Sequence, residues 1–494
     1  MTNDCKCVSF FRLASVARTL AVVTLLSPFC QAQGTRYYVD SDATPPGNGA
    51  DWTTAYAELS DALVASLSPT FGYPVEIWVK EGTYTPKYLA TIDPPPAGSG
   101  IRHFTFEIPA DVHLWGGFDG TEQSLDDRAG LYASTILSGD VGDPAGGAFT
   151  IVTVGKVSAP TSPHRLDGFT ITGGLASDIN SAQPKETQGA GLHARWATDL
   201  TIRNCTFENC AAVDGGAIHM WRGKLTMSHA VVQSCYSVFN GGGMYLTGLT
   251  DDAELHSVMF SDCETSFLQD LAFGHGGAIY VGPPNSSTGN HRVRVFNGLF
   301  QGNEAMRGGA VYVQYSANDA AQGTTWVNCT FSRNKAKYLC SGGSGWSCQV
   351  EGEGRAFYFE FGGIGHQLKN SVVWGNAGSD TRKEDIFLEQ AGITAKYCDL
   401  EEEPVLWPGT GNIFVDPRFQ APLLGNFQLK FDSPAIGVGR NLVVPDDLTD
   451  LDDDGNTTEK APWSLIPEHP RIDGLTQTFI VDMGAHEYRY TYPQ

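Results

Sequence analysis

Aromatic and imidazole side chains recur behind a Gly-led motif and are the strongest candidates for a ligand-binding surface. The motif reads GAGLH at 189, GGAIH at 215, GGGMY at 241, GGAIY at 276, GGAVY at 308 and a degenerate GRAFY at 354. Together with a tryptophan just after the second motif, its terminal residues form the predicted ligand-binding set: His193, His219, Trp221, Tyr245, Tyr280, Tyr312 and Tyr358. Exposed rings in a row bind sugar rings. A second interpretation stays open, in which the rings stack across strands as a scaffold.

An Asp-rich segment near the C-terminus is the predicted metal site. Asp450, Asp452 and Asp454 alternate in DLDDDGN, which resembles the start of a calcium loop. The glutamate expected at loop position 12 is replaced by Ala461, although Glu459 is near. Calcium is therefore the one cofactor that the sequence suggests, and an Asp-rich turn without an ion is the alternative.

The sequence does not assemble a catalytic site. Proton abstraction next to a sugar carboxylate needs a basic residue beside calcium-binding carboxylates, and only Arg292 and Arg294 in HRVRVF alternate onto one strand face. An ordinary strand edge explains them equally well. The GHG triplet at 274 imitates a polygalacturonase motif, but the repeat accounts for it because Gly276 begins GGAIY. Catalytic residues stay unknown.

Cysteines occupy two kinds of position. Cys340 and Cys348 flank SGGSGWS in the longest turn and are predicted to form a disulfide. A second set stands three residues after a recurring apolar position, where cysteines give way to asparagines along the chain: Cys210, Cys235, Cys263, Asn303, Asn334 and Asn376. We expect these residues to form a ladder inside the protein.

A repeat positions all of these residues. Its anchors are Ile171, Phe207, Val232, Phe260, Phe300, Phe331 and Val373, each with an apolar residue five positions earlier. A small or polar residue lies three positions before each anchor: Gly168, Asn204, His229, Ser257, Asn297, Asn328 and Asn370. A spacing of five puts two core residues on opposite strand faces unless a bend resets the alternation, and asparagine tolerates the left-handed backbone of such a bend.

Each repeat therefore predicts a strand, a bend, a second strand, a turn and a Gly-led third strand. This order is that of one coil of a parallel β-helix. An antiparallel sandwich would not need equivalent residues at fixed columns. Apolar residues at helical spacing from Ala55 to Leu67 predict an amphipathic helix that covers the open N-terminal end. The predicted divisions are 33–165 for the N-terminal cap and first coils, 166–400 for the central repeats, and 401–494 for the final coil and an acidic, irregular C-terminal cap.

The alternation of GGA[ILV] with F-x-x-N resembles the repeat of chlamydial polymorphic outer membrane proteins, within the pectin-lyase-like superfamily. The ends are similar to those of bacterial exported β-helix proteins, with RYYVDSDA and VHLWGGFDGTE early and FDSPAIGVG and VDMGAHEY late. This resemblance implies an all-β, right-handed parallel β-helix. It implies no single activity, because the superfamily hosts lyases, hydrolases and adhesins.

Composition and the N-terminus bound the location and the partners. Three basic residues precede an apolar run from Leu20 to Leu26, which predicts a signal peptide over 1–32 and a secreted, cell-surface or outer-membrane-associated protein. The run is too short to span a membrane. The net charge of −23 argues against a nucleic-acid partner and against unassisted binding of polyanionic sugars.

The function favoured by these features is that of a non-catalytic module that binds a glycan or another surface component, as adhesins do. The alternative is a polysaccharide lyase or glycoside hydrolase that acts on an extracellular polysaccharide. Binding is favoured because aromatic residues align into a column whereas paired carboxylates do not.

Overall fold

A computed structural model describes residues 34–488, except 70–71, 92–93, 131, 156–162, 182, 266–273, 284–291, 315–322, 338, 342–346, 351, 361–363, 379–383, 390, 403–406, 408, 448–459 and 461–479. The predicted signal peptide and the predicted calcium ligands Asp450, Asp452 and Asp454 lie outside these residues. Gly34 begins the unit to which all described residues belong.

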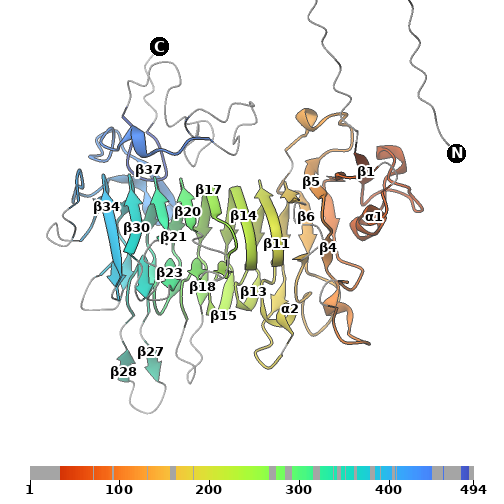
Figure 1. The fold of residues 1–494 in the computed structure, drawn as a ribbon, viewed down its shortest axis with the longest axis horizontal. Coiled ribbons are helices and arrows are strands. Elements are labelled where there is room, and N and C mark those ends of the chain that lie inside the picture. Colours follow the sequence, from red (N-terminus) through yellow and green to blue (C-terminus); the bar gives the residue numbers. More distant parts are fainter. Residues whose placement is uncertain are drawn as a thin grey trace, which may run out of the picture. The chain divides into compact units, whose positions relative to one another are not determined.

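The chain winds into a right-handed parallel β-helix, which confirms the predicted fold class (Figure 1). The first wall holds the Gly-led strands, and each strand pairs in parallel with the equivalent strand of the next coil. Its strands are β4 (Phe106–Ile108), β7 (Val152–Gly155), the starts of β11 (Leu192–Arg203) and β14 (Ile218–Gln233), β16 (Met244–Thr247), β19 (Ile279–Val281), β23 (Val311–Gln314), β29 (Phe357–Glu360) and β33 (Ile386–Leu388).

The second wall follows the corner inside β11 and β14, and a bend divides it into two rows of strands. The first row contains β1 (Thr35–Val39), β2 (Val75–Lys80), β5 (Val112–Phe118), β8 (His164–Asp167), β17 (Ala253–Ser261), β20 (Val293–Phe296), β24 (Thr325–Val327), β30 (Ile364–Lys369) and β34 (Gly392–Lys396). The second row contains β3 (Gly82–Tyr84), β6 (Thr135–Ser138), β9 (Thr170–Thr172), β12 (Thr206–Glu208), β21 (Leu299–Gln301), β25 (Thr330–Ser332), β31 (Val372–Val373) and β35 (Asp399–Leu400).

The third wall is a separate parallel sheet that closes each coil. It consists of β10 (Leu175–Ala176), β13 (Ala211–Asp214), β15 (Tyr236–Asn240), β18 (Glu264–Thr265), β22 (Glu304–Ala305), β26 (Lys335–Ala336) and β32 (Ala377–Gly378). Two antiparallel hairpins stand apart from the walls: β27 (Leu339–Ser341) with β28 (Ser347–Val350), and β36 (Phe419–Ala421) with β37 (Asn426–Leu429).

The predicted bends are confirmed. All seven bend residues have positive φ, from 48° at Asn370 to 87° at Gly168, so a left-handed residue does reset the alternation between the two rows of strands. A second column of left-handed residues, two positions after each anchor, was not predicted; it includes Asn209 and Asp262. These two bends turn the chain from the second wall into the third.

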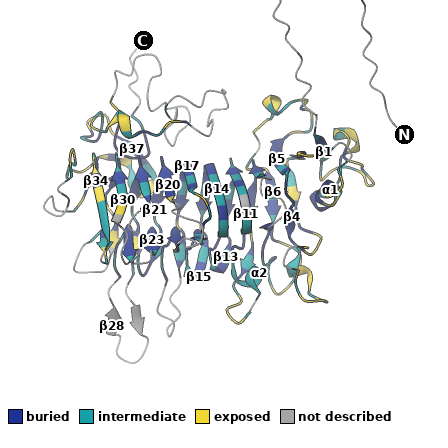
Figure 2. Cartoon of the chain, in the orientation of Figure 1, coloured by how far each residue is buried: buried dark blue, intermediate teal, exposed yellow. Residues whose placement is uncertain are grey.

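The core is a stack of identical positions. The anchors Phe207, Phe260, Phe300 and Phe331 are fully buried, and the last three stack at centroid distances of 5.3 and 4.6 Å. Figure 2 shows this burial along the length of the coils, with exposed residues mostly in caps and loops. Such continuous burial of aromatic side chains is what stabilises a repeat that cannot bury its own face alone.

The predicted internal ladder of cysteines and asparagines is also confirmed. Cys210, Cys235 and Cys263 are buried free thiols. Beyond them, the Asn303 Nδ2 donates a hydrogen bond to the Asn334 Oδ1 at 2.9 Å, and the Asn334 Nδ2 donates to the Asn376 Oδ1 at 3.0 Å. These buried amides are tolerated because the side chain of each asparagine forms a hydrogen bond with the equivalent asparagine of the next coil.

Helix α1 (Leu59–Ser66) covers the N-terminal end of the coils. It buries Leu59, Ala62 and Leu63, as predicted, but it begins later than the apolar spacing indicated, after a 3-10 turn at Trp52–Thr54, and Leu67 is 55% exposed. Asp51 caps the start of that turn, and the turn ends at Thr54, before Ala55. Helix α2 (Pro184–Thr187) and further 3-10 turns (Ile101–His103, Leu125–Asp127, Pro422–Leu424 and Asn441–Val443) lie in connections.

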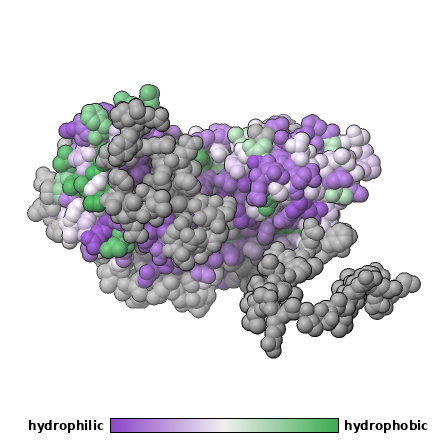
Figure 3. All heavy atoms as spheres, turned by 90° about the horizontal axis from the view of Figure 1, so that it is seen from above, coloured by the Kyte–Doolittle hydropathy of each residue, from purple (hydrophilic) through white to green (hydrophobic). Residues whose placement is uncertain are grey.

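At the C-terminal end, Phe419, Phe427 and Leu429 of the β36–β37 hairpin pack with Leu299 and Val372 in a second core. The hairpin therefore covers the outer face of the second wall over several coils, with Arg333 donating to the Pro422 carbonyl at 3.3 Å, and it does not close the open end as the sequence predicted. Its tip leaves apolar side chains in solvent, with Leu423 82% and Leu424 88% exposed. Figure 3 shows hydrophobic surface gathered on this side of the molecule.

Candidate functional site

The predicted column of rings forms one continuous stack on the outer side of the first wall. Successive rings lie 4.6 to 5.4 Å apart between centroids, and their planes differ by at most 16°. The stack runs through His193, His219, Tyr245, Tyr280, Tyr312, Tyr358 and Phe387. We call it the aromatic ladder. Parallel pairing in register places equivalent residues of neighbouring coils side by side, which produces the stack.

The burial of most of its rings argues against the ladder as an exposed platform, although Tyr245 and Phe387 are half-buried. His193 is 2% exposed, Tyr312 1% and Tyr358 1%. Since the planes are nearly parallel, each ring between the two ends of the ladder presents its faces to two neighbouring rings and leaves no face for a sugar. Burial therefore favours the scaffold interpretation of the ladder.

Polar residues that precede the Gly-led strands explain part of this burial. These turn residues pair across coils, from Asn240 through His275 and Arg307 to Glu353. The His275 ring stacks 4.2 Å from that of Tyr312, and the Arg307 guanidinium carbon lies 5.0 Å from the Tyr358 ring centroid. Arg307 also pairs with Glu353 at 3.3 Å. The His275 and Arg307 side chains therefore pack against the ladder.

The ladder is electrically neutral near pH 7. Burial lowers the pKa of His193 to about 3, and it raises the pKa of Tyr245 to about 12. Burial likewise raises the pKa values of Tyr280, Tyr312 and Tyr358. Their hydroxyls donate to side chains of the next coil: Tyr280 to Gln314 at 2.5 Å, Tyr312 to Glu360, and Tyr358 to Glu389.

One acidic residue beside the ladder predicts a pH dependence of stability. Burial raises the pKa of Asp214 to about 6, above its ordinary value of 3.8, although the Asn240 Nδ2 donates to the Asp214 Oδ1 at 3.0 Å. The folded protein therefore takes up this proton at higher pH than the unfolded chain does, and the group destabilises the fold increasingly between about pH 4 and pH 6.

Asp214→Asn should raise the free energy of unfolding by about 1–3 kcal/mol at about pH 8 and leave it unchanged near pH 4. Urea unfolding at the two pH values measures this difference. Asp199→Asn is the control, since Asp199 is 39% exposed and pairs with Lys224 at 3.5 Å. A gain of equal size at both pH values would contradict the assignment.

One predicted ligand-binding residue lies outside the ladder, in a cluster at the corner between the first and second walls. Trp221 contacts Trp196 edge to face at 4.9 Å between ring centroids. The Arg222 guanidinium carbon lies 4.1 Å from the Trp196 ring centroid and 4.7 Å from that of Trp221. Arg195 lies 4.7 Å over Trp221. We call Arg195, Trp196, Trp221 and Arg222 the Trp–Arg corner; all four are half-buried.

Two bulky residues of this corner adopt a backbone conformation that usually belongs to glycine. The φ angle is 61° at Trp196 and 63° at Arg222, and Gly248 has the equivalent place on the next coil with a φ of 59°. A left-handed residue other than glycine costs about 1–2 kcal/mol. Such strain concentrates at functional sites, where the surrounding structure maintains it. The corner therefore holds a Trp and an Arg at positions where glycine would be more stable.

The hydrogen-bonding groups of Arg222 are not all satisfied, because its Nε is buried and has no partner among the described residues. A guanidinium that stacks on rings through its faces keeps its N–H donors in the plane of the group, where they can meet a ligand oxygen. Among the described residues, no carboxylate lies within ion-pair distance of Arg222, and its Nε has no hydrogen-bond partner. The sequence singled out Trp221 but missed Trp196 and Arg222, since a corner residue follows no strand alternation.

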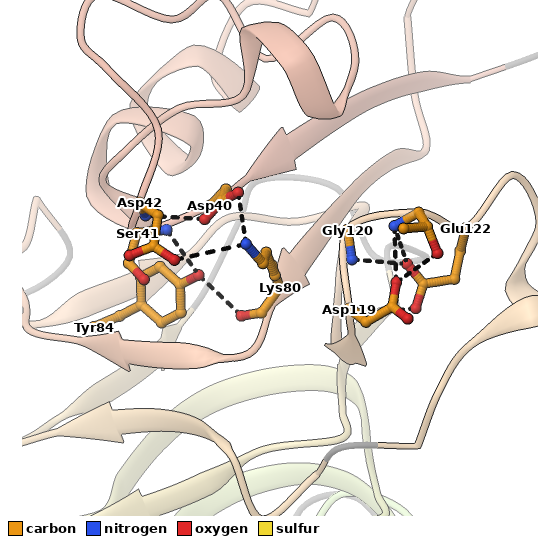
Figure 4. Close-up of polar contacts among 9 residues, drawn as sticks. Asp40, Ser41, Asp42, Lys80, Tyr84, Asp119, Gly120 and Glu122 are labelled. Atoms are coloured by element: carbon orange, nitrogen blue, oxygen red, sulfur yellow. Dashed lines mark hydrogen bonds and ion pairs between the residues drawn. The ribbon is translucent and has the colours of Figure 1, made fainter.

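Lys80 lies near four carboxylates, a combination that a lyase could use as a base beside a cation site, but its contacts argue against a role as a base (Figure 4). The Lys80 Nζ lies 3.0 Å from the Asp40 Oδ2 and 3.6 Å from the Asp42 Oδ2. The hydrogen bond that Lys80 donates to Asp40 raises the pKa of Lys80, so the ammonium keeps its proton, which argues against a role as a base. The Glu122 carboxylate accepts hydrogen bonds from the backbone N–H groups of Asp119 at 2.7 Å and Gly120 at 3.0 Å. These carboxylates hold turns in place.

The arginine pair considered from the sequence has a structural role as well. Arg294 bridges Asp252 at 2.6 Å and Glu254 at 2.8 Å across β17 and β20. Within the described ranges, no group of three or more His, Cys, Asp or Glu side chains is placed to hold a metal ion.

The predicted disulfide stays a prediction. The β27–β28 hairpin places Cys340 directly opposite Cys348 in its backbone register. Their side chains lie outside the described part of the structure.

Comparisons with known proteins give fold neighbours only. No family model and no curated protein matches the chain. Among solved structures, a rhamnogalacturonan lyase matches with 13% identity over 78% of this chain and 91% of its own, at a TM-score of 0.40. Pectate lyase Pel9A matches with 15% identity over 93% and 98%, at a TM-score of 0.41. A pectin methylesterase from Aspergillus niger matches with 14% identity over 74% and 86%, at a TM-score of 0.31.

Similarities this low carry no information on activity, and the β-helix assignment rests on the strand register itself. In the described part of the chain, no helix is both long enough and apolar enough to cross a membrane.

Proposed function

We propose that this protein is an exported, non-catalytic β-helix that binds a glycan through the Trp–Arg corner. The observation that carries the proposal is the left-handed backbone at Trp196 and Arg222, which maintains a strained Trp–Arg cluster on a half-exposed corner. Export follows from the predicted signal peptide, and a cell-surface location from the resemblance of the repeat to polymorphic outer membrane proteins.

The chemistry of the corner suits a sugar. Indole rings offer apolar surface for the C–H faces of a pyranose, and guanidinium edges donate hydrogen bonds to its hydroxyl oxygens. The ladder beneath supports the corner: His219 lies two residues before Trp221 on β14, and its ring is fixed between His193 at 5.3 Å and Tyr245 at 5.0 Å. A rigid wall therefore supports the site.

A polysaccharide lyase or glycoside hydrolase is the second candidate, and one observation favours it. Glu360 and Glu389 have equivalent places on β29 and just after β33, so their backbones lie about 4.8 Å apart. Retaining glycosidases use two carboxyl groups at about 5 Å. Both carboxylates, however, are engaged by tyrosine hydroxyls of the ladder.

A polysaccharide panel tests the proposal. The full mature chain is assayed for retention and for cleavage of each polysaccharide, beside Trp196→Gly. We expect retention without cleavage, and a loss of affinity of about tenfold or more in Trp196→Gly, because a stacked aromatic contact is removed. Cleavage that is lost in Glu360→Gln would establish the second candidate. No retention of any glycan would refute binding.

A further inference from the structure

Like charges stand side by side on the second wall, far from the Trp–Arg corner. Lys369 ends β30 and Lys396 ends β34, and the two residues are direct partners in the parallel register. Lys396 is exposed and Lys369 is half-buried. Like charges placed directly opposite each other destabilise a sheet. Burial and the neighbouring Lys396 both lower the pKa of Lys369, in that order.

The same wall pairs opposite charges elsewhere. Arg36 on β1 contacts Glu76 on β2 at 3.0 Å, and Glu254 on β17 contacts Arg294 on β20 at 2.8 Å. Among the described residues, by contrast, no carboxylate lies within ion-pair distance of Lys369 or Lys396.

A third cation is brought to the same edge by the C-terminal part of the chain. The Arg440 backbone N–H donates to the Asn370 Oδ1 at 2.8 Å, and the Asn370 Nδ2 donates to the Arg440 carbonyl at 3.1 Å. Asn370 directly follows Lys369. The Arg440 guanidinium carbon lies 5.7 Å from the ring centroid of Tyr397, which directly follows Lys396. Two reciprocal hydrogen bonds across 70 residues thus fix the Arg440 backbone at Asn370, and the guanidinium lies over Tyr397, so Arg440 contacts the residue that follows each lysine.

We propose that Lys369, Lys396 and Arg440 bind an oxyanion group, the sulfate or carboxylate of an acidic polysaccharide. We call these residues the basic edge. Ammonium and guanidinium groups form charge-assisted hydrogen bonds with such oxygens. The class of ligand rests on the proposed glycan binding, but the site does not depend on the Trp–Arg corner.

The surrounding charge selects this ligand over a denser polyanion. The net charge of −23 repels a chain that carries phosphates at every unit, while screening over about 8 Å isolates the basic edge from distant carboxylates. A polysaccharide with separated acidic groups can place one group on the basic edge. The sequence argued against polyanionic sugars on net charge alone. A local group of basic residues could bind such a sugar in spite of the negative net charge.

The test compares two double variants of the full mature chain that lose the same charge. Lys369→Gln/Lys396→Gln removes the lysine pair. Lys87→Gln/Lys335→Gln is the control, because these lysines are 47% and 52% exposed and their ion pairs are long, at 3.6 and 3.7 Å. Affinity is measured for chondroitin sulfate, for alginate, for neutral dextran and for a single-stranded DNA, over a range of salt concentrations.

We expect Lys369→Gln/Lys396→Gln to lose about tenfold or more in affinity for the two acidic glycans, with the slope of log affinity against log salt reduced by about two. Its melting temperature should equal or exceed that of the wild type, because the lysine repulsion is gone. The control should keep both affinity and slope.

An equal loss in both variants would overturn the proposal, since net charge would then explain it. Unchanged affinity in Lys369→Gln/Lys396→Gln would also overturn it, as would tighter binding of the DNA than of the acidic glycans. The two proposals can fail separately. If affinity for acidic glycans is lost in Lys369→Gln/Lys396→Gln but kept in Trp196→Gly, the result supports the basic edge and refutes the Trp–Arg corner. If the protein binds a neutral glycan only when Trp196 is present, and binds no acidic glycan, the result supports the Trp–Arg corner and refutes the basic edge.

Discussion

Asn334→Ala is expected to lower the free energy of unfolding by about 3–5 kcal/mol. The Asn334 Oδ1 accepts hydrogen bonds from the Asn303 backbone N–H at 3.1 Å and from the Asn303 Nδ2 at 2.9 Å. Its Nδ2 donates to the Phe300 carbonyl at 2.9 Å and to the Asn376 Oδ1 at 3.0 Å. Each buried group left unsatisfied costs about 1–3 kcal/mol, and the substitution orphans several at once.

Urea unfolding followed by tryptophan fluorescence measures the loss. Asn180→Ala is the matched control, because Asn180 is exposed and its replacement should change the free energy of unfolding by less than about 0.5 kcal/mol. A loss below about 1 kcal/mol at Asn334 would mean that the asparagine ladder does not hold the coils together.

Tyr312→Ala is expected to cost about 3–5 kcal/mol of stability and to leave glycan affinity of the folded protein unchanged. Tyr312 is 1% exposed and stacks at 5.4 Å on Tyr280, 5.0 Å on Tyr358 and 4.2 Å on His275. Its removal opens a cavity in the middle of the aromatic ladder. Unfolding curves and glycan titrations on the same preparation measure the two effects.

Tyr312→Phe separates the ring from its hydroxyl. This variant keeps the stack and loses only the hydrogen bond to Glu360, so it should cost about 1 kcal/mol. If Tyr312→Phe stayed folded and lost glycan binding, the ladder would be a ligand site after all and the scaffold assignment would fail.

The fold could be read from the sequence because a solenoid repeats its constraints. Each coil needs a left-handed residue at the same place, and Gly168, Asn204 and Asn297 mark that place as residue types that tolerate it. Stacking makes every alignment column a physical ladder, which is why the register of Tyr245 with Tyr280 and the asparagine ladder followed from spacing alone.

The candidate site could be predicted only in part, because alternation gives direction and not burial. It placed the aromatic ladder on the outer side of the first wall but gave no sign that His275 and Arg307 pack against it. The predicted column also ended at Tyr358, because the next coil contributes Phe387 without a Gly-led motif before it. Trp196 and Arg222 were missed because a left-handed corner belongs to neither strand pattern.

The basic edge was missed for a related reason. Lys369 and Lys396 occupy equivalent places on β30 and β34, but Arg440 joins them only through the hydrogen bonds between its backbone and Asn370. Contacts between residues 70 positions apart do not follow from repeat spacing. Net charge, the quantity that the sequence gives directly, describes the whole chain and hides a local excess of the opposite sign.

The central claim is that Trp196 is kept in a strained conformation for binding, and Trp196→Gly tests it most directly. One preparation of this variant and one of the wild type are compared by melting temperature and by dissociation constant for the best glycan of the panel. The account predicts a melting temperature within a few degrees of the wild type, because relief of about 1–2 kcal/mol of backbone strain offsets the lost ring contacts, together with a loss of affinity of about tenfold or more. A large drop in melting temperature with unchanged affinity would show that Trp196 is a structural residue and would contradict the account.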